Sequence, residues 1–244
     1  MAKKTAIKDV EIESLNKSES TIKLNYKISA KCKNKRQKEF LNILKNEEKK
    51  ICFGMGSAGS GKSYISLSYA LSALKNKEYE QVVILIPTCQ GGSKALQIGF
   101  LKGTLEEKYA PFQEADRFTI EKILKNSGNA EHKEISKQLI NSDKIRYDLV
   151  NFARGKTYDS SLILINESEN YSKEDMLLLL TRIGENSKIV ITGDEKQIDR
   201  KDLGKSGMTY AYERLKDLEE VGMVEFTEED IVRNPLISKI LEKW

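Results

Sequence analysis

The sequence is poor in the residues that build metal clusters and disulfide frameworks. Its 244 residues include three widely spaced cysteines and a single histidine, His132. No C-x-x-C pair and no histidine cluster occurs, which argues against a zinc site or a disulfide-stapled chain. Ser-His-Asp or Cys-His catalysis would depend entirely on His132, which lies in the polar stretch GNAEHKE and is expected at the surface.

Proline and long apolar runs are also scarce. Three prolines and 15 glycines are too few for a fibrous or low-complexity chain. No apolar run approaches the roughly 20 residues that span a bilayer, and the N-terminal residues lack the apolar stretch of a secretory signal. We therefore expect a cytoplasmic protein without a membrane partner. The net charge of +4 does not by itself indicate nucleic acid.

The N-terminal region has a period-two pattern. In STIKLNYKIS, residues 20–29, Ile22, Leu24, Tyr26 and Ile28 alternate with polar residues, as in a half-buried strand. The preceding DVEIESL would pair with it across NKSES. This pattern predicts a small N-terminal β-hairpin extension over residues 1–30, followed by one main domain over residues 31–244.

A basic stretch follows the predicted hairpin. Between Lys23 and Lys50, ten Lys or Arg residues stand against three Glu, and Phe40, Leu41 and Leu44 lie on one face of a predicted helix. Such a run is either an ordinary solvated face or a surface that contacts nucleic-acid phosphates. The sequence leaves both interpretations open.

From residue 51 onward, continuous apolar strands alternate with helical patterns. Strands are predicted at ICFGM, QVVILIP, SLILI, SKIVITG and GMVEF, with helices over 62–75, 103–115 (broken near Pro111), 172–183 and 206–216, and a C-terminal helix from about Pro235. Continuous apolar strands between helices indicate a mostly parallel sheet with helices on both faces. The predicted class is therefore α/β.

A glycine-rich loop joins the first of these strands to a helix. GMGSAGSGKS contains G-x-x-x-x-G-K-[ST], from Gly56 to Ser63. Glycines let backbone N–H groups turn inward around phosphate oxygens, and the following helix points its N-terminal dipole at them. Lys62 supplies a positive charge to the phosphates, and the Ser63 hydroxyl is a candidate Mg²⁺ ligand. The loop predicts a nucleoside triphosphate site.

Several further stretches resemble the PhoH family of P-loop ATPases, which is similar to the core of superfamily 1 helicases. The resemblance rests on NKRQKEFLNIL, GMGSAGSGKS, GFLKGTLEEKYAPF, FARGKTYDSSLILINESEN, LLTRIGENSKIVITGDEKQID, KSGM and EEDIVRNPLI, in this order. It covers about residues 34–242 and implies a RecA-like P-loop NTPase fold with ATP and Mg²⁺ as the bound species. The implied nucleotide-binding residues are Gln37, Gly56, Ser57, Ala58, Gly59, Ser60, Gly61, Lys62, Ser63 and Tyr64.

The same resemblance assigns roles around the phosphates. Gln37 would read the adenine edge, although by pattern alone it is an unremarkable exposed helix residue. Gln197 would sense the γ-phosphate or the attacking water, and Asp194 would hold Mg²⁺-bound water or orient Gln197. Arg233 would stabilise charge on the transferring phosphoryl group in its own or a neighbouring subunit, with Arg182 as a second candidate.

The acidic motif after the third predicted apolar strand departs from the family pattern. Where the family has Asp-Glu-Ala-Gln-Asn after the third apolar strand, this chain has Asn166-Glu167-Ser168-Glu169-Asn170. Glu167 stands where a base would activate the attacking water, whereas Asn166 removes a negative charge from the metal side. The sequence therefore predicts weaker Mg²⁺ binding and slower turnover, with Asp194 or Glu169 as compensating groups.

Two functions follow from these motifs. The first is an Mg²⁺-dependent ATPase coupled to RNA or single-stranded DNA, with Lys62, Glu167, Gln197 and Arg233 as its catalytic residues and Ser63, Asn166 and Asp194 at the metal. The second is an ATP-binding switch or assembly protein with little or no hydrolysis, which Asn166 favours. One RecA-like core is too short to translocate alone, so coupling to nucleic acid implies self-association, most simply into a ring.

Overall fold

The computed structural model describes residues 25–87, 105–198 and 206–232, without the side chains of residues 105–112. Its strands are β1 (Ile51–Gly56), β2 (Gln81–Ile86), β3 (Ile145–Leu149), β4 (Ser161–Ile165), β5 (Lys188–Gly193) and β6 (Val221–Phe226). Its α-helices are α1 (Lys35–Lys45), α2 (Lys62–Asn76), α3 (Leu105–Asn126), α4 (His132–Asn141), α5 (Lys173–Leu180) and α6 (Gly207–Leu215).

The described strands form one sheet in the order β3-β2-β4-β5-β1-β6, and every pairing is parallel. In the register of this sheet, Cys52 of β1 lies between Val190 of β5 and Gly222 of β6. Because the strands are parallel, the loops after β1, β4, β5 and β6 all leave the same edge of the sheet. This edge carries the sequence motifs.

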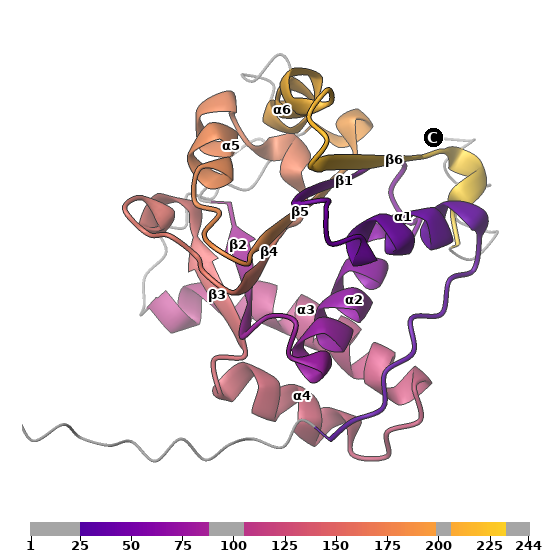
Figure 1. The fold of residues 1–244 in the computed structure, drawn as a ribbon. Coiled ribbons are helices and arrows are strands. Elements are labelled where there is room, and N and C mark those ends of the chain that lie inside the picture. The colour runs from indigo at the N-terminus through magenta and orange to yellow at the C-terminus, as the bar shows by residue number, and fades with distance from the viewer. Residues whose placement is uncertain (1–24, 88–104, 199–205, 233–244) are drawn as a thin grey trace, which may run out of the picture.

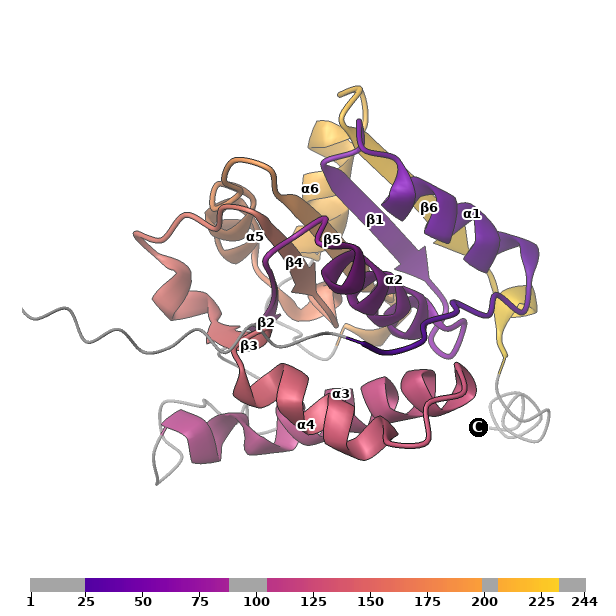
Figure 2. The same cartoon turned by 60° about the horizontal axis from the view of Figure 1, so that its bottom comes forward.

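Helices cover both faces of the sheet (Figures 1 and 2). One face packs on α1, α2, α3 and α4 through a core that includes Phe40, Leu71 and Ile123. The other face packs on α5 and α6 through residues such as Tyr171 and Met208. The predicted α/β class with a parallel sheet and helices on both faces is confirmed, and it is consistent with a P-loop NTPase fold.

The predicted N-terminal hairpin is not confirmed. Residues 1–24 lie outside the described residues, and residues 25–33 form no strand. They run instead as an extended segment, called the strap below, from the turn between α3 and α4 along α2 to α1 (Figures 1 and 2). Tyr26 of the strap is buried, and its hydroxyl donates to the Leu71 carbonyl of α2 at 2.6 Å.

Three further expectations differ from the structure. Helix α3 runs without a break through Pro111, because its packing against α2 and α4 outweighs the one backbone hydrogen bond that a proline removes. Strand β3 and helix α4 were not expected, since the strand motif IRYDL carries two charged residues within five. The expected C-terminal helix lies outside the described residues.

Candidate functional site

The loop between β1 and α2 turns sharply at its glycines. Gly56, Gly59 and Gly61 have φ values of 107°, 80° and 86°, in the left-handed region that disfavours other residues. A Cβ on Gly56 would overlap the Phe226 carbonyl oxygen, and one on Gly61 would lie 2.7 Å from Gln37 Nε2. Both glycines are therefore required by the loop's close packing.

Lys62 begins α2 and folds back over the loop. Its side chain is buried, and Nζ donates to the carbonyls of Gly56 at 2.6 Å and Ser57 at 2.8 Å. The ammonium also lies 5.8 Å from the centre of the Phe226 ring. The next residue, Ser63, is exposed on the first turn of the helix. The Lys62 ammonium and the exposed Ser63 hydroxyl thus belong to adjacent residues in the first turn of α2.

The residues after β4 lie beside this loop. Asn166 Oδ1 accepts a hydrogen bond from Thr192 Oγ1 of β5 at 2.9 Å. Glu167 follows with φ 50° and ψ 42°, and it is exposed. A non-glycine residue in the left-handed region costs conformational energy, and such strain concentrates at functional positions. Glu167 lines the same pocket as residues of the loop after β1.

Asp194, directly after β5, accepts hydrogen bonds both from the loop between β1 and α2, called the phosphate loop below, and from the segment after β5. Its Oδ2 accepts from the backbone N–H of Ala58 at 2.8 Å and from Gln197 Nε2 at 3.1 Å, while Oδ1 accepts from Lys196 N at 3.1 Å. Asp194 is buried, so these hydrogen bonds satisfy a charge that would otherwise be costly. The loop after β1 and the loop after β5 therefore form one connected unit.

Glu169 adds a second buried carboxylate. Its Oε2 accepts from the backbone N–H of Asp194 at 3.0 Å. Burial is the main cause that raises the pKa of this carboxyl to about 7; backbone hydrogen bonds oppose the shift, and the nearby carboxylates of Glu167 and Asp194 add to it. Three carboxyl groups thus lie close to one another at the carboxyl edge of β4 and β5.

These groups converge on one pocket of about 290 Å³. Its lining residues come from the loop after β1, the start of α2, and the segments after β4 and β5. They are Ala58, Gly59, Gly61, Lys62, Ser63, Tyr64, Glu167, Glu169, Thr192, Gly193, Asp194 and Gln197. Residues more than a hundred positions apart in the sequence therefore meet in one cavity whose donors and charges suit a phosphate chain.

The donors at this pocket are oxygens, the ligand type that Mg²⁺ prefers. Ser63 and Asp194 line the pocket. Asn166 does not line it, but it accepts a hydrogen bond from Thr192, which does. Within the described residues, no group of three or more acidic, histidine or cysteine side chains is arranged to hold a metal ion. The donor set fits an ion held mainly by phosphate oxygens and water, with Ser63 contributing a hydroxyl.

Gln37 differs from the expectation of an exposed helix residue. It is 3% exposed, its Nε2 donates to the Ser60 carbonyl at 2.7 Å, and its Oε1 accepts from Lys33 N at 2.7 Å. Its first structural role is therefore to brace the phosphate loop. That burial could not be read from the helical pattern, because the residue it contacts is 23 positions away.

Of the two candidate arginines, Arg182 is not among the described residues that line the pocket. Arg182 donates through its guanidinium to the carbonyls of Leu178 and Lys156 and to Thr181 Oγ1. These contacts fix it at the end of α5. Arg233 lies outside the described residues. Sequence reasoning missed Thr192 and Phe226, which contact Asn166 and Lys62, and their only signal was a place at the end of an apolar strand.

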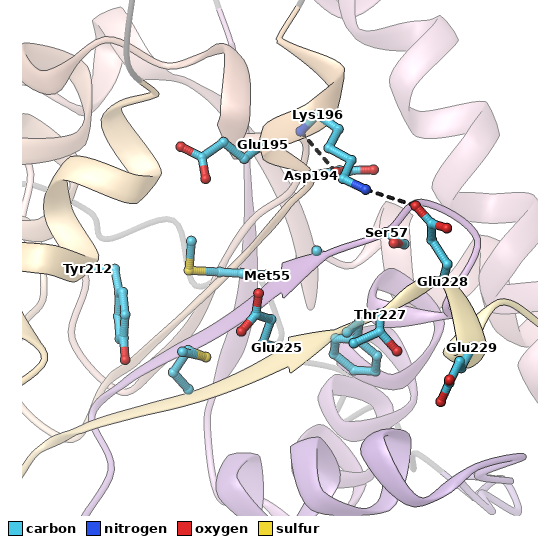
Figure 3. Close-up of a pocket in the computed structure, with 13 residues that line it drawn as sticks. Met55, Ser57, Asp194, Glu195, Lys196, Tyr212, Glu225, Thr227, Glu228 and Glu229 are labelled. Atoms are coloured by element: carbon cyan, nitrogen blue, oxygen red, sulfur yellow. Dashed lines mark hydrogen bonds and ion pairs between the residues drawn. The ribbon is translucent and has the colours of Figure 1, made fainter.

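A larger pocket, of about 650 Å³, lies on the far side of the same loop. Figure 3 shows Lys196 joined to Glu228 at one end of it and Tyr212 at the other. Glu195, Glu225 and Glu229 also line it, and it lacks Lys62 and Ser63, which line the smaller pocket. The smaller pocket is therefore the candidate nucleotide site despite its size.

No α-helix in the described parts of the chain has the length and apolarity of a membrane span.

Comparison with known proteins identifies the family to which the chain is similar. The family described as PhoH-like protein matches residues 29–244. The chain is 33% identical over 244 residues to a PhoH-like protein of Bacillus subtilis (strain 168), covering all of this chain and 72% of that protein. It is 30% identical over 208 residues to a PhoH-like protein of Mycobacterium tuberculosis (strain ATCC 25618 / H37Rv), covering 85% of this chain and 56% of that protein.

Protein PhoH of Escherichia coli (strain K12) is 30% identical over 214 residues, which cover 87% of this chain and 57% of that protein. The chain thus spans little more than half the length of the mycobacterial and Escherichia coli relatives. The family match covers every residue that lines the described pocket, from Ala58 to Gln197. The chain belongs to the PhoH family.

Proposed function

We propose that this protein binds ATP with Mg²⁺ in the pocket at the end of β1, β4 and β5, and that it hydrolyses the nucleotide. The observation that carries the proposal is the convergence of Lys62, Ser63, Glu167 and Gln197 on one cavity of about 290 Å³. A phosphate chain needs a cation and inward N–H groups, and hydrolysis needs a base for water. The pocket provides Lys62 as the cation and Glu167 as the base.

The residues divide this work among themselves. Lys62 leaves its loop carbonyls to meet the phosphates, and Ser63 donates its oxygen to the metal. The metal, when bound, neutralises phosphate charge. The exposed Glu167 carboxylate orients and deprotonates water, while Gln197 is held beside it through Asp194. Gln37 supports the loop and is the candidate reader of adenine, and Arg233 is the candidate charge-stabilising arginine.

A second function is favoured by Asn166. Its side chain is neutral and engages Thr192 instead of lining the pocket, so the metal side of the site has one carboxylate fewer than the family pattern. In this alternative the protein binds ATP as a switch or assembly signal and turns it over slowly or not at all. Nucleotide binding is common to both functions.

The discriminating experiment measures nucleotide binding and turnover in the same preparations. Wild type, Lys62→Ala and Glu167→Gln are compared for binding of a fluorescent, non-hydrolysable ATP analogue and for phosphate release with and without single-stranded RNA. Hydrolysis predicts that Glu167→Gln binds the analogue normally but loses at least tenfold in turnover. Turnover that is measurable and unchanged in Glu167→Gln contradicts the hydrolytic assignment, and binding unchanged in Lys62→Ala contradicts the site itself.

The proposed partners are RNA or single-stranded DNA and further copies of this chain, in the cytoplasm. A ring with nucleotide at its subunit boundaries would supply the second moving body that translocation requires. Light scattering with and without ATP measures the assembly mass. A monomer under both conditions excludes the ring and, with it, translocation by this chain alone.

A further inference from the structure

The strap, residues 25–33, has two faces of different chemistry. Tyr26 is buried, and Ile28, Ala30 and Cys32 pack partly buried against the core beneath α2 and α4. The alternate residues Lys27, Ser29, Lys31 and Lys33 are exposed. The period-two pattern that predicted a strand is therefore real, but it distinguishes a helix-packed face from a solvent face.

The strap is held in this extended form by specific hydrogen bonds. The backbone N–H of Lys27 donates to Asn129 Oδ1 at 2.8 Å, and Asn129 Nδ2 donates back to the Lys27 carbonyl at 2.7 Å. Ser29 N donates to Ser127 Oγ at 3.0 Å. Both partners lie in the turn between α3 and α4. The lysines therefore project from a fixed backbone.

Extended backbone places every second side chain on one side at intervals of about 6.6 Å. One such interval separates Lys31 from Lys33, and two separate Lys27 from Lys31. This spacing is similar to that of successive phosphates along an extended nucleic-acid strand. Among the described residues, no ion pair engages these three lysines, whereas Lys35 and Arg36 at the start of α1 are paired with Glu39. Three ammonium groups are thus available in one line.

The end of the strap is connected to the phosphate loop through the side chain of Gln37. The backbone N–H of Lys33 donates to Gln37 Oε1 at 2.7 Å, and Gln37 Nε2 donates to the Ser60 carbonyl of the phosphate loop at 2.7 Å. One buried amide therefore contacts both the strap and the loop that would hold ATP. A change in the position of the Lys33 backbone can therefore be transmitted to Ser60 through the Gln37 side chain.

We infer that the strap is a binding surface for the phosphate backbone of single-stranded nucleic acid, and that Gln37 couples its occupancy to the phosphate loop. The binding part stands independently of hydrolysis, while the coupling part rests on the proposed nucleotide site. Gln37 acts here as a positioning residue.

The binding surface is tested by charge removal with a matched control. Lys27→Ser, Lys31→Ser and Lys33→Ser are combined. The control combines Lys137→Ser in α4, Lys173→Ser at the start of α5 and Lys216→Ser directly after α6, which removes the same charge. Affinity for a labelled 20-nucleotide RNA is measured over a salt series, without nucleotide. The strap variant should lose roughly tenfold or more in affinity, and the slope of log K against log salt should shrink by about 2.

Three outcomes would overturn the surface assignment. They are unchanged affinity in the strap variant, an equal loss in the control variant, and equal affinity for single strands and for a duplex of the same length. The last outcome would indicate a general polyanion effect without the strand geometry. Basal ATP turnover without RNA should be the same in wild type and in a Lys27→Ser, Lys31→Ser protein, because neither lysine lines the pocket or contacts Gln37.

The coupling is tested by binding linkage. RNA affinity is measured with and without the non-hydrolysable ATP analogue for wild type and for Gln37→Leu, which keeps the size of the side chain but removes both hydrogen bonds. Wild type should show a several-fold change in RNA affinity on adding the analogue, and Gln37→Leu should retain RNA binding without that change. An undiminished change in a folded Gln37→Leu protein overturns the coupling. If wild type fails to bind the analogue, the proposed nucleotide site fails while the RNA measurement still decides the strap.

Discussion

Asp194 Oδ2 accepts hydrogen bonds from the backbone N–H of Ala58 and from Gln197 Nε2, at 2.8 Å and 3.1 Å. One oxygen atom thus joins the phosphate loop after β1 to the segment after β5. Because Asp194 is buried, water does not easily take the place of this acceptor for either donor when the carboxylate is removed. The loop conformation and the position of Gln197 therefore depend on the same side chain.

Replacing Asp194 with Asn tests this dependence. An amide offers one acceptor oxygen in place of two, so either Ala58 N–H or Lys196 N–H faces an NH₂ group. We expect the free energy of unfolding to fall by about 1–3 kcal/mol and affinity for an ATP analogue to fall with it. Urea denaturation and analogue titration measure the two effects. The control is Lys196→Ala, which removes the fully exposed Lys196–Glu228 pair and should leave both quantities close to wild type.

Asn166→Asp should raise activity without disturbing the fold. The aspartate keeps the acceptor oxygen for Thr192 Oγ1 and adds one negative charge near the metal side of the pocket. We expect Mg²⁺ to saturate turnover at a lower concentration and turnover to rise severalfold. Phosphate release as a function of Mg²⁺ concentration tests this. An unchanged Mg²⁺ dependence would mean that position 166 does not limit the metal site.

Glu169 should make stability depend on pH. Its pKa is raised to about 7 in the folded protein, mainly by burial, so the folded state binds a proton more tightly than the unfolded state. The free energy of unfolding should therefore fall as pH rises from about 4.5 to 7, by about 3 kcal/mol at most from this group. Glu169→Gln should remove this slope, because an amide oxygen still accepts from Asp194 N–H. Urea unfolding at pH 5 and pH 8 compares the two proteins, and parallel pH profiles would contradict the assignment.

Tyr26→Phe should loosen the strap. The variant removes only the hydroxyl that donates to the Leu71 carbonyl, and it leaves that buried acceptor without this partner. We expect a loss of about 1 kcal/mol in the free energy of unfolding, together with faster amide exchange over residues 25–33. Hydrogen exchange measured by mass spectrometry reports both. Protection unchanged across the strap would show that the Asn129 and Ser127 contacts hold it alone.

Much of the fold could be predicted from local pattern. The apolar runs SLILI and KIVITG became the central strands β4 and β5, because an unbroken apolar run between helices is stable only when both faces are covered. The loop from Gly56 to Ser63 took its expected place between β1 and α2. The positive φ values of Gly56, Gly59 and Gly61 are a local backbone requirement, so the spacing of glycines in the sequence is enough to predict this loop.

The errors arose where a local pattern has two tertiary solutions. Alternation around Tyr26 and Ile28 requires an extended backbone with one buried face, but it does not say whether a strand or a helix layer covers that face. Pro111 weakens a helix locally, and the packing of α3 decided otherwise. Gln37 looked exposed because its partner, Ser60, belongs to another element.

The sequence by itself determined the loop that could hold phosphates, the apolar runs that became β1, β2, β4, β5 and β6, and the chemistry of Asn166 and Glu167. Each of these depends on residue type and short spacing. Only the tertiary structure decided that Asp194 binds Ala58, that Glu169 is buried beside them, and that the strap reaches the phosphate loop through Gln37. These contacts join residues brought together by parallel strand order, which no short stretch of sequence encodes.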